Sequence, residues 1–255
     1  MNNRIAVVVP IYREHLDPIS KHSIKTLLNV LKKDRQVFFL YNNLMDIKEY
    51  VGLRDNRASF MLAEDAKWFE STKTYSKLLK QYDFWKKFED YDYVLIYQTD
   101  CLLLADNLDA WCESGYDYIG APILGYGSKW KNIPCVGNGG LSLRKVSTFL
   151  TVTHESFMNE FGKDIEEICS NHPEYNDYED LYFADLIPSI YCGFKKPNYK
   201  VAALFAFDRN PDSAFMINKS IPDGLHWYHK YIEFYMKLGL EFPQDVIDYV
   251  KENVN

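Results

Sequence analysis

The first hundred residues alternate between short apolar runs and longer segments that have apolar residues at helical spacing. Residues 5–11 (IAVVVPI) are β-branched and lack polar alternation, which is typical of a strand buried on both faces of a parallel sheet. Similar runs predict further strands over 36–41, 58–62 and 93–97. Apolar residues three and four positions apart predict long helices over 19–33 and 72–88, and a short helix is predicted over 46–51.

This alternation predicts βαβ units with right-handed crossovers, and therefore an α/β fold with a mostly parallel sheet flanked by helices. The second half of the chain is less regular, which indicates a mixed arrangement. The elements predicted there are strands over 116–120, 141–144 and 201–207, and helices over 145–169, 179–190, 228–238 and after Pro243. Because no repeat, low-complexity tract or linker interrupts the pattern, we expect residues 1–255 to form a single domain.

Composition agrees with a globular protein that has a sizeable core. Hydrophobic residues make up 47% of the 255 residues and charged residues 25%, which is ordinary for this class. Aromatic residues reach 16%, with 20 Tyr. Tyrosine rings offer flat faces to sugars and nucleobases, although a tyrosine-rich core would give the same composition.

Charge argues against nucleic acid as a partner. The net charge is −7 and the pI about 5.4, whereas non-specific nucleic-acid binding depends on clustered positive charge. Local basic runs occur at 129–131 (KWK) and 195–200 (KKPNYK). Each run is either solvated surface or a patch for phosphate or an anionic membrane.

The cysteines and the chain start favour a cytoplasmic protein. The five cysteines show neither a CxxC pair nor zinc-ligand spacing, and an odd number fits reduced thiols. The start, MNNRIAVVVPIY, is too short and too quickly structured for a signal peptide, and no apolar run approaches the roughly 18 residues of a membrane-spanning helix. We expect a soluble cytoplasmic protein and leave peripheral contact with a membrane open.

Ligands of open parallel sheets bind at the carboxyl ends of the strands, and two predicted strands end in candidate residues. The first strand leads into Pro10, Ile11, Tyr12 and Arg13, and the fourth leads into Gln98, Thr99 and Asp100. Neither loop has a GxGxxG or GxxxxGK[ST] pattern, which disfavours a dinucleotide site and a P-loop.

A nucleotide could still bind at this edge, with Tyr12 against its base and a metal on its phosphates. Asp100 suits a Mg²⁺ or Mn²⁺ ligand, since these ions take few protein ligands and share the rest with water and phosphate oxygens. The alternative is that Asp100 is an N-cap or a hydrogen-bonded turn residue.

Three later stretches carry further candidates. The glycine-rich segment with Gly137, Asn138, Gly139 and Gly140 either lets the backbone approach a ligand or forms a hairpin or bulge. Glu179 and Asp180 at a predicted helix start either complement the helix dipole or provide a general base. His226, beside Trp227, is either a core residue or a ligand that the fold brings to Asp100.

Taken in order, these stretches resemble a bacterial family of glycosyltransferases of the GT-A type, formerly described only as a domain of unknown function. The matching segments are VVVPIY at 7–12, STKTYSKLL at 71–79, YVLIYQTDCLLL at 93–104, GYDYIGAP at 115–122, VGNGGLSLRK at 136–145, EDLYF at 179–183 and PDGLHW at 222–227. The resemblance spans nearly the whole chain. It implies a GT-A-like fold with a nucleotide-sugar-binding half over 1–105 and an acceptor and catalytic half over 106–255.

The resemblance also implies roles for individual residues. GT-A enzymes commonly hold Mn²⁺ or Mg²⁺ with an Asp-x-Asp motif; Asp100 matches its last acid, and Gln98 stands at the first and supplies no charge. His226 matches a late histidine that completes the metal site. Asp180, with Glu179, matches the acid pair that supplies the base of inverting members. Residues 137–140 match a stretch near the transferred sugar, and Tyr75 lies in a motif on the donor side.

The expected function is transfer of a sugar from a nucleotide-diphosphate donor to a glycan or lipid-linked acceptor. The resemblance also implies surface-glycan assembly in a bacterial cytoplasm, with peripheral contact with the inner membrane face left open. A sugar nucleotidyltransferase shares the sheet, but the first loop lacks the glycine- and Lys/Arg-rich phosphate signature expected there. A glycan-binding module without catalysis is the third alternative, and it stays open because Gln98 stands where an acid is expected.

Overall fold

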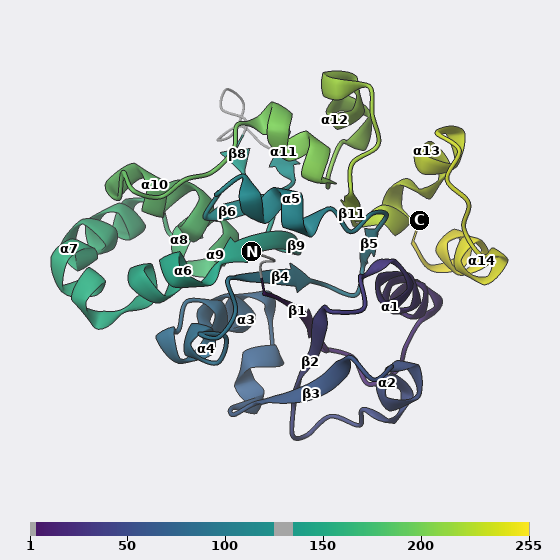
Figure 1. The fold of residues 1–255 in the computed structure, drawn as a ribbon, viewed down its shortest axis with the longest axis horizontal. Coiled ribbons are helices and arrows are strands. Elements are labelled where there is room, and N and C mark those ends of the chain that lie inside the picture. Colours follow the sequence, from purple (N-terminus) through teal and green to yellow (C-terminus); the bar gives the residue numbers. More distant parts are fainter. Residues whose placement is uncertain (1–3, 125–134, 255) are drawn as a thin grey trace.

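In the computed structural model, residues 4–124 and 135–254 are described, and a six-stranded sheet forms their centre (Figure 1). Its strands in spatial order are β3 (Ala58–Ala63), β2 (Gln36–Asn42), β1 (Ile5–Pro10), β4 (Tyr93–Tyr97), β9 (Leu141–Lys145) and β6 (Tyr118–Gly120). Strands β1 to β4 are mutually parallel, and within the described residues β9 alone runs against the others of this sheet. The α/β class and the mostly parallel sheet are therefore confirmed.

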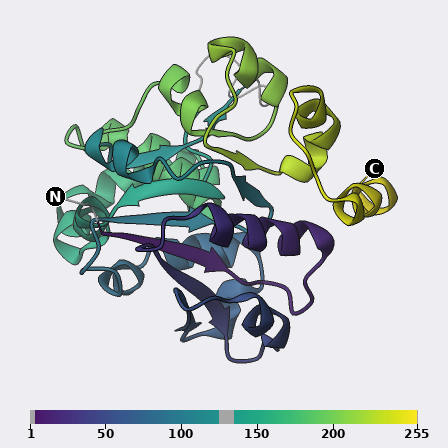
Figure 2. The ribbon, with the colours of Figure 1, turned by 45° about the vertical axis from the view of Figure 1, so that its right-hand side comes forward.

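Both faces of the sheet are covered, as the uniformly apolar strands predicted. Ile5, Val7 and Val9 of β1 pack into one core, and Ala6 and Val8 pack into the other. The first core is closed by α1 (Pro18–Val30), α2 (Lys48–Leu53), α5 (Leu108–Glu113) and α11 (Tyr199–Phe205). The second is closed by α3 (Thr72–Leu79), α4 (Tyr82–Lys86), α6 (Val146–Thr153), α7 (Glu155–Asn171) and α10 (Ile187–Ile190), on the other side of the sheet in Figure 2.

A small second sheet joins the first at the end of β4. Its order is β10 (Ala206–Phe207), β11 (Gly224–His226) and β5 (Cys101–Leu103), with β10 parallel and β5 antiparallel to β11. A third apolar core lies here, formed with α12 (Pro211–Asn218), α13 (Ile232–Lys237) and α14 (Gln244–Asn253). A two-stranded ladder of β7 (Pro122–Ile123) and β8 (Cys135–Val136) completes the mixed second half.

Long predicted helices are interrupted where a residue leaves helical geometry. The helix predicted over 72–88 divides into α3 and α4 because Gln81 is extended (ψ 134°). The helix predicted over 145–169 divides at His154, which is also extended and whose ring accepts a hydrogen bond from Ser156 N–H to cap α7. Over 179–190 the chain forms α9 (Glu179–Leu181), a π-helical turn η2 (Tyr182–Leu186) and α10, and over 228–238 it forms the 3₁₀ turn η3 (Tyr228–Tyr231) and α13.

The strand predicted over 201–207 was wrong in its first part, since residues up to Phe205 belong to α11. The side chain of Asn198 accepts hydrogen bonds from the backbone N–H groups of Lys200 and Val201 and so caps this helix. Side-chain capping of the first orphan N–H groups favours helix over strand at this point. Only Ala206 and Phe207 are extended and paired, as β10.

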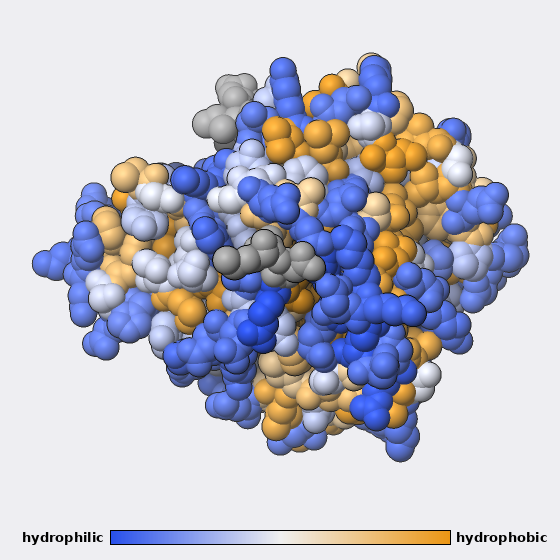
Figure 3. All heavy atoms as spheres, in the orientation of Figure 1, coloured by the Kyte–Doolittle hydropathy of each residue, from blue (hydrophilic) through white to orange (hydrophobic). Residues whose placement is uncertain are grey.

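The surface mixes polar and apolar side chains, with apolar ones gathered at the upper right of Figure 3, on the side where Figure 1 labels α12 and α13. Leu204, Met216, Ile221 and Met236 are the large exposed apolar residues of α11 to α13 and the adjoining loop.

None of the helices within the described ranges is long and apolar enough to cross a bilayer. Cytoplasmic location and peripheral membrane contact stay predictions, and the basic run 129–131 lies outside the described residues.

Candidate functional site

A cavity of ≈ 500 Å³ opens at the carboxyl ends of β1 and β4. The strand order reverses between these two neighbours, and ligands of open α/β sheets bind at such switch points. Pro10 at the end of β1, Tyr12 just beyond it, and Gln98 and Asp100 after β4 line the cavity. These four predicted residues therefore lie together at one edge of the sheet.

The glycine segment reaches the same cavity because β9 is antiparallel to β4. Its register pairs Tyr97 with Leu141, and the backbone N–H of Gln98 donates a 2.8 Å hydrogen bond to the Gly140 carbonyl. Asn138, Gly139 and Gly140 line the cavity. A Cβ atom at Gly140 would collide with His226 Nε2 and Gln98 Oε1, so the close approach requires glycine at this position.

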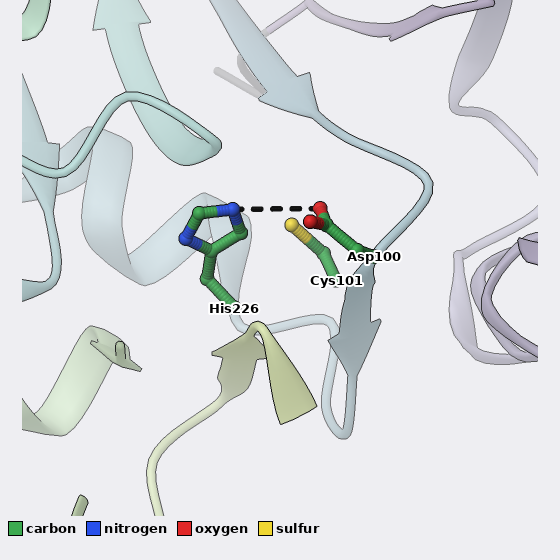
Figure 4. A group of neighbouring side chains, drawn as sticks. All are labelled: Asp100, Cys101 and His226. Atoms are coloured by element: carbon green, nitrogen blue, oxygen red, sulfur yellow. Dashed lines mark ion pairs between the residues drawn. The ribbon is translucent and has the colours of Figure 1, made fainter. Parts of the chain in front are cut away.

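Asp100 lies in a tight turn that carries the chain from the first sheet to the second. Cys101 N–H donates to the Gln98 carbonyl at 3.0 Å, and β5 begins at Cys101. Strand β11 pairs His226 with Cys101, so the histidine lies beside Asp100 (Figure 4). The distance from Asp100 Oδ1 to His226 Nε2 is 3.4 Å. The prediction that the fold brings a late histidine to this aspartate is therefore met.

The two facing atoms of this pair are suited to a cation. Asp100 Oδ1 and His226 Nε2 are both buried, and neither has a hydrogen-bond partner among the described residues. Carboxylate oxygen and imidazole nitrogen are donors that Mn²⁺ accepts. With Cys101 Sγ, their ligand atoms lie within 4.8 Å of one another. The donor set and the two orphaned atoms fit a divalent metal held by Asp100 and His226.

Cys101 is a poor third ligand. Its thiol donates a 3.2 Å hydrogen bond to the Gly140 carbonyl. Burial, followed by the nearby Asp100 carboxylate, raises the pKa of Cys101 well above its usual range. Because only the thiolate binds metal well, Cys101 contributes packing here.

Charges around the histidine are balanced by two acids. Its Nδ1 lies 2.9 Å from Asp208 Oδ1, on the side of the ring away from Asp100. Burial opposes a charge on His226, but Asp100 and Asp208 outweigh it and raise the pKa of His226 to about 10. Burial likewise opposes the charge of Asp100, but the imidazolium outweighs it and lowers the pKa of this carboxyl.

Glu179 forms a buried ion pair. Arg144 Nη1 and Nη2 donate to its two carboxylate oxygens at 2.8 and 3.0 Å, and both residues are at most 5% exposed. The guanidinium also lies 5.0 Å from the Tyr118 ring centroid and donates to Ser142 Oγ through Nε. Both carboxylate oxygens of Glu179 are therefore occupied by this guanidinium.

Asp180 also lines the cavity, and its carboxylate, unlike that of Glu179, accepts hydrogen bonds from backbone N–H groups. Oδ2 accepts from Gly139 N–H at 3.2 Å and Oδ1 from Leu181 N–H at 2.8 Å. Burial and the neighbouring Glu179 charge raise the pKa of Asp180 to about 7. A carboxyl group that titrates near neutrality beside a cavity is suited to act as a general base.

The remaining predicted residues lie around this centre. Tyr12 is 38% exposed, and its hydroxyl accepts a hydrogen bond from Thr99 Oγ1 at 3.3 Å. Tyr75 lines the cavity from α3, with a buried hydroxyl. Ile11 is fully buried in the core, and Arg13 pairs with Asp17 on the surface at 2.7 Å; neither lines the cavity. Gly137, with φ +152°, comes just before the glycine turn and does not line the cavity.

Sequence reasoning missed Asp208, Arg209 and Trp227. Arg209 and Trp227 line the cavity, with the guanidinium 4.4 Å from the indole ring centroid, and Trp227 adopts a left-handed backbone (φ 52°) that is costly for a bulky residue. Asp208 directly follows β10, and Asp100 likewise lies in the turn after β4. The rule that ligands gather at strand ends, applied to the predicted strand over 201–207, would have found it.

The fold is that of the GT-A-like glycosyltransferases. The structure superimposes on the galactosyltransferase LgtC in complex with donor and acceptor sugar analogues, with a TM-score of 0.55 and 16% identity, over 87% of this chain and 86% of that one. An active-site mutant of LgtC aligns with a TM-score of 0.54 and 16% identity, over 94% and 98% of the two chains. At this identity the likeness defines the fold alone.

Residues 59–226 match the family described as protein of unknown function (DUF5672), and the chain belongs to that family. No match was found among curated proteins. The matched segment contains most of the cavity lining, including Asp100, Asp180 and His226.

We expect the Arg144–Glu179 pair to be a large contributor to stability. The substitution Glu179→Gln leaves a buried guanidinium without its counter-charge, and we expect the free energy of unfolding to fall by about 3–5 kcal/mol. Urea denaturation monitored by circular dichroism measures this change. Glu89→Gln, in the exposed Lys86–Glu89 pair, is the control and should leave stability unchanged. Equal effects of the two substitutions would contradict the assignment.

Proposed function

We propose that the protein is a glycosyltransferase that moves a sugar from a nucleotide-diphosphate sugar to a hydroxyl of a glycan or lipid-linked glycan. The observation that carries the proposal is the meeting, in one cavity, of a candidate metal pair and a carboxylate with a pKa near 7. Sugar transfer needs both, because negative charge develops on the departing diphosphate while the acceptor hydroxyl loses a proton. Likeness to the fold of a galactosyltransferase supports the same class.

The donor is assigned to the side of the cavity formed by β1 and β4. Tyr12 offers a partly exposed ring for the base, and Thr99 holds the hydroxyl of that ring. Gln98 and Asp100 then face the phosphates. Residues 1–105 would thus provide most of the donor site.

Asp100 and His226 would hold the cation, Mn²⁺ or Mg²⁺. When bound, it neutralises the charge that develops on the leaving diphosphate. Gln98 adds no charge to this site. Arg209 lies in the cavity wall, where its guanidinium would supply a second positive group for the phosphates.

Asp180 is proposed as the general base that accepts the proton of the attacking hydroxyl. The backbone N–H groups of Gly139 and Leu181 orient its carboxylate. Glu179 would act indirectly: its charge is committed to Arg144, yet it still raises the basicity of its neighbour. Direct displacement with such a base predicts inversion at the anomeric carbon. The acceptor would enter over residues 137–140, from the side formed by the second half of the chain.

We expect UDP or GDP together with Mn²⁺ to raise the melting temperature, because a ligand that binds only the folded state stabilises it. Asp100→Ala should abolish the part of the shift that depends on Mn²⁺. Differential scanning fluorimetry with a panel of nucleotides, with and without the metal, measures both effects.

The melting-temperature panel, together with three further assays, separates the rival functions. Absence of stabilisation by any nucleotide, combined with binding to glycans, would indicate a glycan-binding module. Release of pyrophosphate from a nucleoside triphosphate and a sugar phosphate would indicate a sugar nucleotidyltransferase. Hydrolysis of a nucleotide sugar, found by screening donors, would support the proposed transferase and name its donor.

The rate should depend on pH through Asp180. Its carboxyl is protonated below pH 7 and cannot accept a proton, so kcat/KM should rise tenfold per pH unit below about 7 and level off above it. Asp180→Asn should lower kcat by roughly 10²–10⁴ and remove this rise. Asp185→Asn is the control, since Asp185 binds the Tyr175 hydroxyl and does not line the cavity. A product with retained anomeric configuration, seen by NMR, would refute the base assignment.

A further inference from the structure

Asp208 uses its two carboxylate oxygens to hold two different parts of the cavity. Oδ1 lies 2.9 Å from His226 Nδ1, and Oδ2 accepts a hydrogen bond from Asn138 Nδ2 at 3.1 Å. The residue is 3% exposed and does not line the cavity itself. Any effect of Asp208 on a ligand must therefore pass through His226 or Asn138.

The second sheet fixes the position of Asp208. Strands β10 and β11 are parallel and pair Ala206 with Gly224 and Phe207 with Leu225. The next step of this register brings Asp208 opposite His226. Backbone pairing of β10 with β11 thus sets the position of the Asp208 carboxylate, and this position does not depend on a flexible loop.

The imidazole ring is held from several directions. Asp208 holds Nδ1, and Gly140 lies so close to the opposite edge that an added Cβ would collide with Nε2 and Cδ2. The ring of Trp227 lies 5.5 Å away at a 34° tilt. With these contacts, Nε2 points toward Asp100 (Figure 4).

The other oxygen of Asp208 extends the network to the glycine turn. Asn138, which donates to Oδ2, also accepts a 3.0 Å hydrogen bond from Gly140 N–H through its own Oδ1. The preceding residue, Gly139, donates its N–H to Asp180. A continuous chain of contacts therefore joins His226 to the turn that holds the proposed base.

We propose that Asp208 is the positioning residue of this site, and this inference rests on the proposed function. One oxygen of Asp208 fixes the orientation of His226 for metal binding through Nε2. The other, through Asn138, fixes the turn at Gly139 and Gly140 against which Asp180 is held.

The chemistry of the His226 contact is general. A carboxylate that accepts a hydrogen bond from one ring nitrogen selects the tautomer whose other nitrogen carries the free lone pair. Loss of such a partner typically weakens metal binding by 10–100-fold. Neither oxygen of Asp208 has a role in the proposed reaction itself, so the effect is one of orientation.

Mn²⁺ binding tests the inference without the need for a sugar substrate. Titration of Mn²⁺ alone, followed by the electron paramagnetic resonance signal of the free ion, should give a Kd that is 10–100-fold weaker in Asp208→Asn than in the wild type. The matched control is Asp117→Asn, because Asp117 is also a buried acid with two hydrogen bonds but is remote from the cavity. The control should leave the Mn²⁺ affinity within twofold of the wild type.

Two further readouts separate orientation from general loss of structure. In the presence of diamagnetic Mg²⁺, long-range ¹H–¹⁵N spectra should show one tautomer of His226 in the wild type and a mixture in Asp208→Asn. Hydrogen exchange of the Gly140 amide should accelerate, because a side-chain amide has a single acceptor oxygen and cannot accept from both His226 and Asn138 as the carboxylate does. Exchange in the β1 strand should not change.

Gly140→Ala keeps the test decisive if Asp208→Asn does not fold. The added methyl group displaces the imidazole of His226 while Asp208 remains in place, and the Mn²⁺ affinity should fall at least tenfold. The control is Gly52→Ala, because an added Cβ there meets no atom within 4 Å. Wild-type protein that binds no Mn²⁺ would overturn the metal site and the role of Asp208 together. Wild-type binding that persists unchanged in Asp208→Asn, or in Gly140→Ala, would overturn the positioning role alone and leave the proposed transferase standing.

Discussion

The Gly140 carbonyl is the group on which the arrangement of the cavity depends. It accepts the backbone N–H of Gln98 at 2.8 Å and the Cys101 thiol at 3.2 Å. The first contact ends the pairing of β4 with β9, and the second holds the start of β5. Asp100 lies between them, at the point where the chain leaves one sheet for the other. Because the turn is anchored to a residue without a side chain, His226 can approach it from the second sheet.

Burial then divides the acids of the cavity into different roles. Glu179 pairs with Arg144, while Asp180, one residue further on, has no salt bridge among the described residues, and burial raises its pKa to about 7. Two adjacent carboxylates thus differ because their surroundings differ, and a difference of this kind is what the proposed role of Asp180 as a base requires. Burial of the Asp180 carboxyl costs stability, which the hydrogen bonds from Gly139 and Leu181 N–H offset only in part, and the Arg144–Glu179 pair lies beside it.

The local pattern of hydrophobic residues was sufficient to predict the cavity residues that follow β1 and β4. It was insufficient to predict the residues that other parts of the chain bring to the cavity. Periodicity predicted β1 and β4, and the strand-end rule then predicted Tyr12 and Asp100. His226 became a candidate ligand through the family resemblance, since its approach to Asp100 depends on the pairing of β5 with β11, a long-range contact without a local signal. The partner of Glu179 likewise lies far away in the sequence, since Arg144 is on β9 and Glu179 is on α9. Asp208 follows a strand of only two residues, in a segment where side-chain capping overrode the strand-like composition.

The position of Asp208 also bears on the absence of charge at Gln98. An Asp-x-Asp motif provides two carboxylates around one cation. Here Asp100 faces the proposed metal position directly, and Asp208 lies behind the imidazole, 2.9 Å from Nδ1. With His226 neutral and bound to a cation, the two aspartates together carry two negative charges, the same total as the motif. The second charge acts from a greater distance, so its attraction is weaker. Such a site would retain a divalent cation while holding it less firmly than two direct carboxylates would.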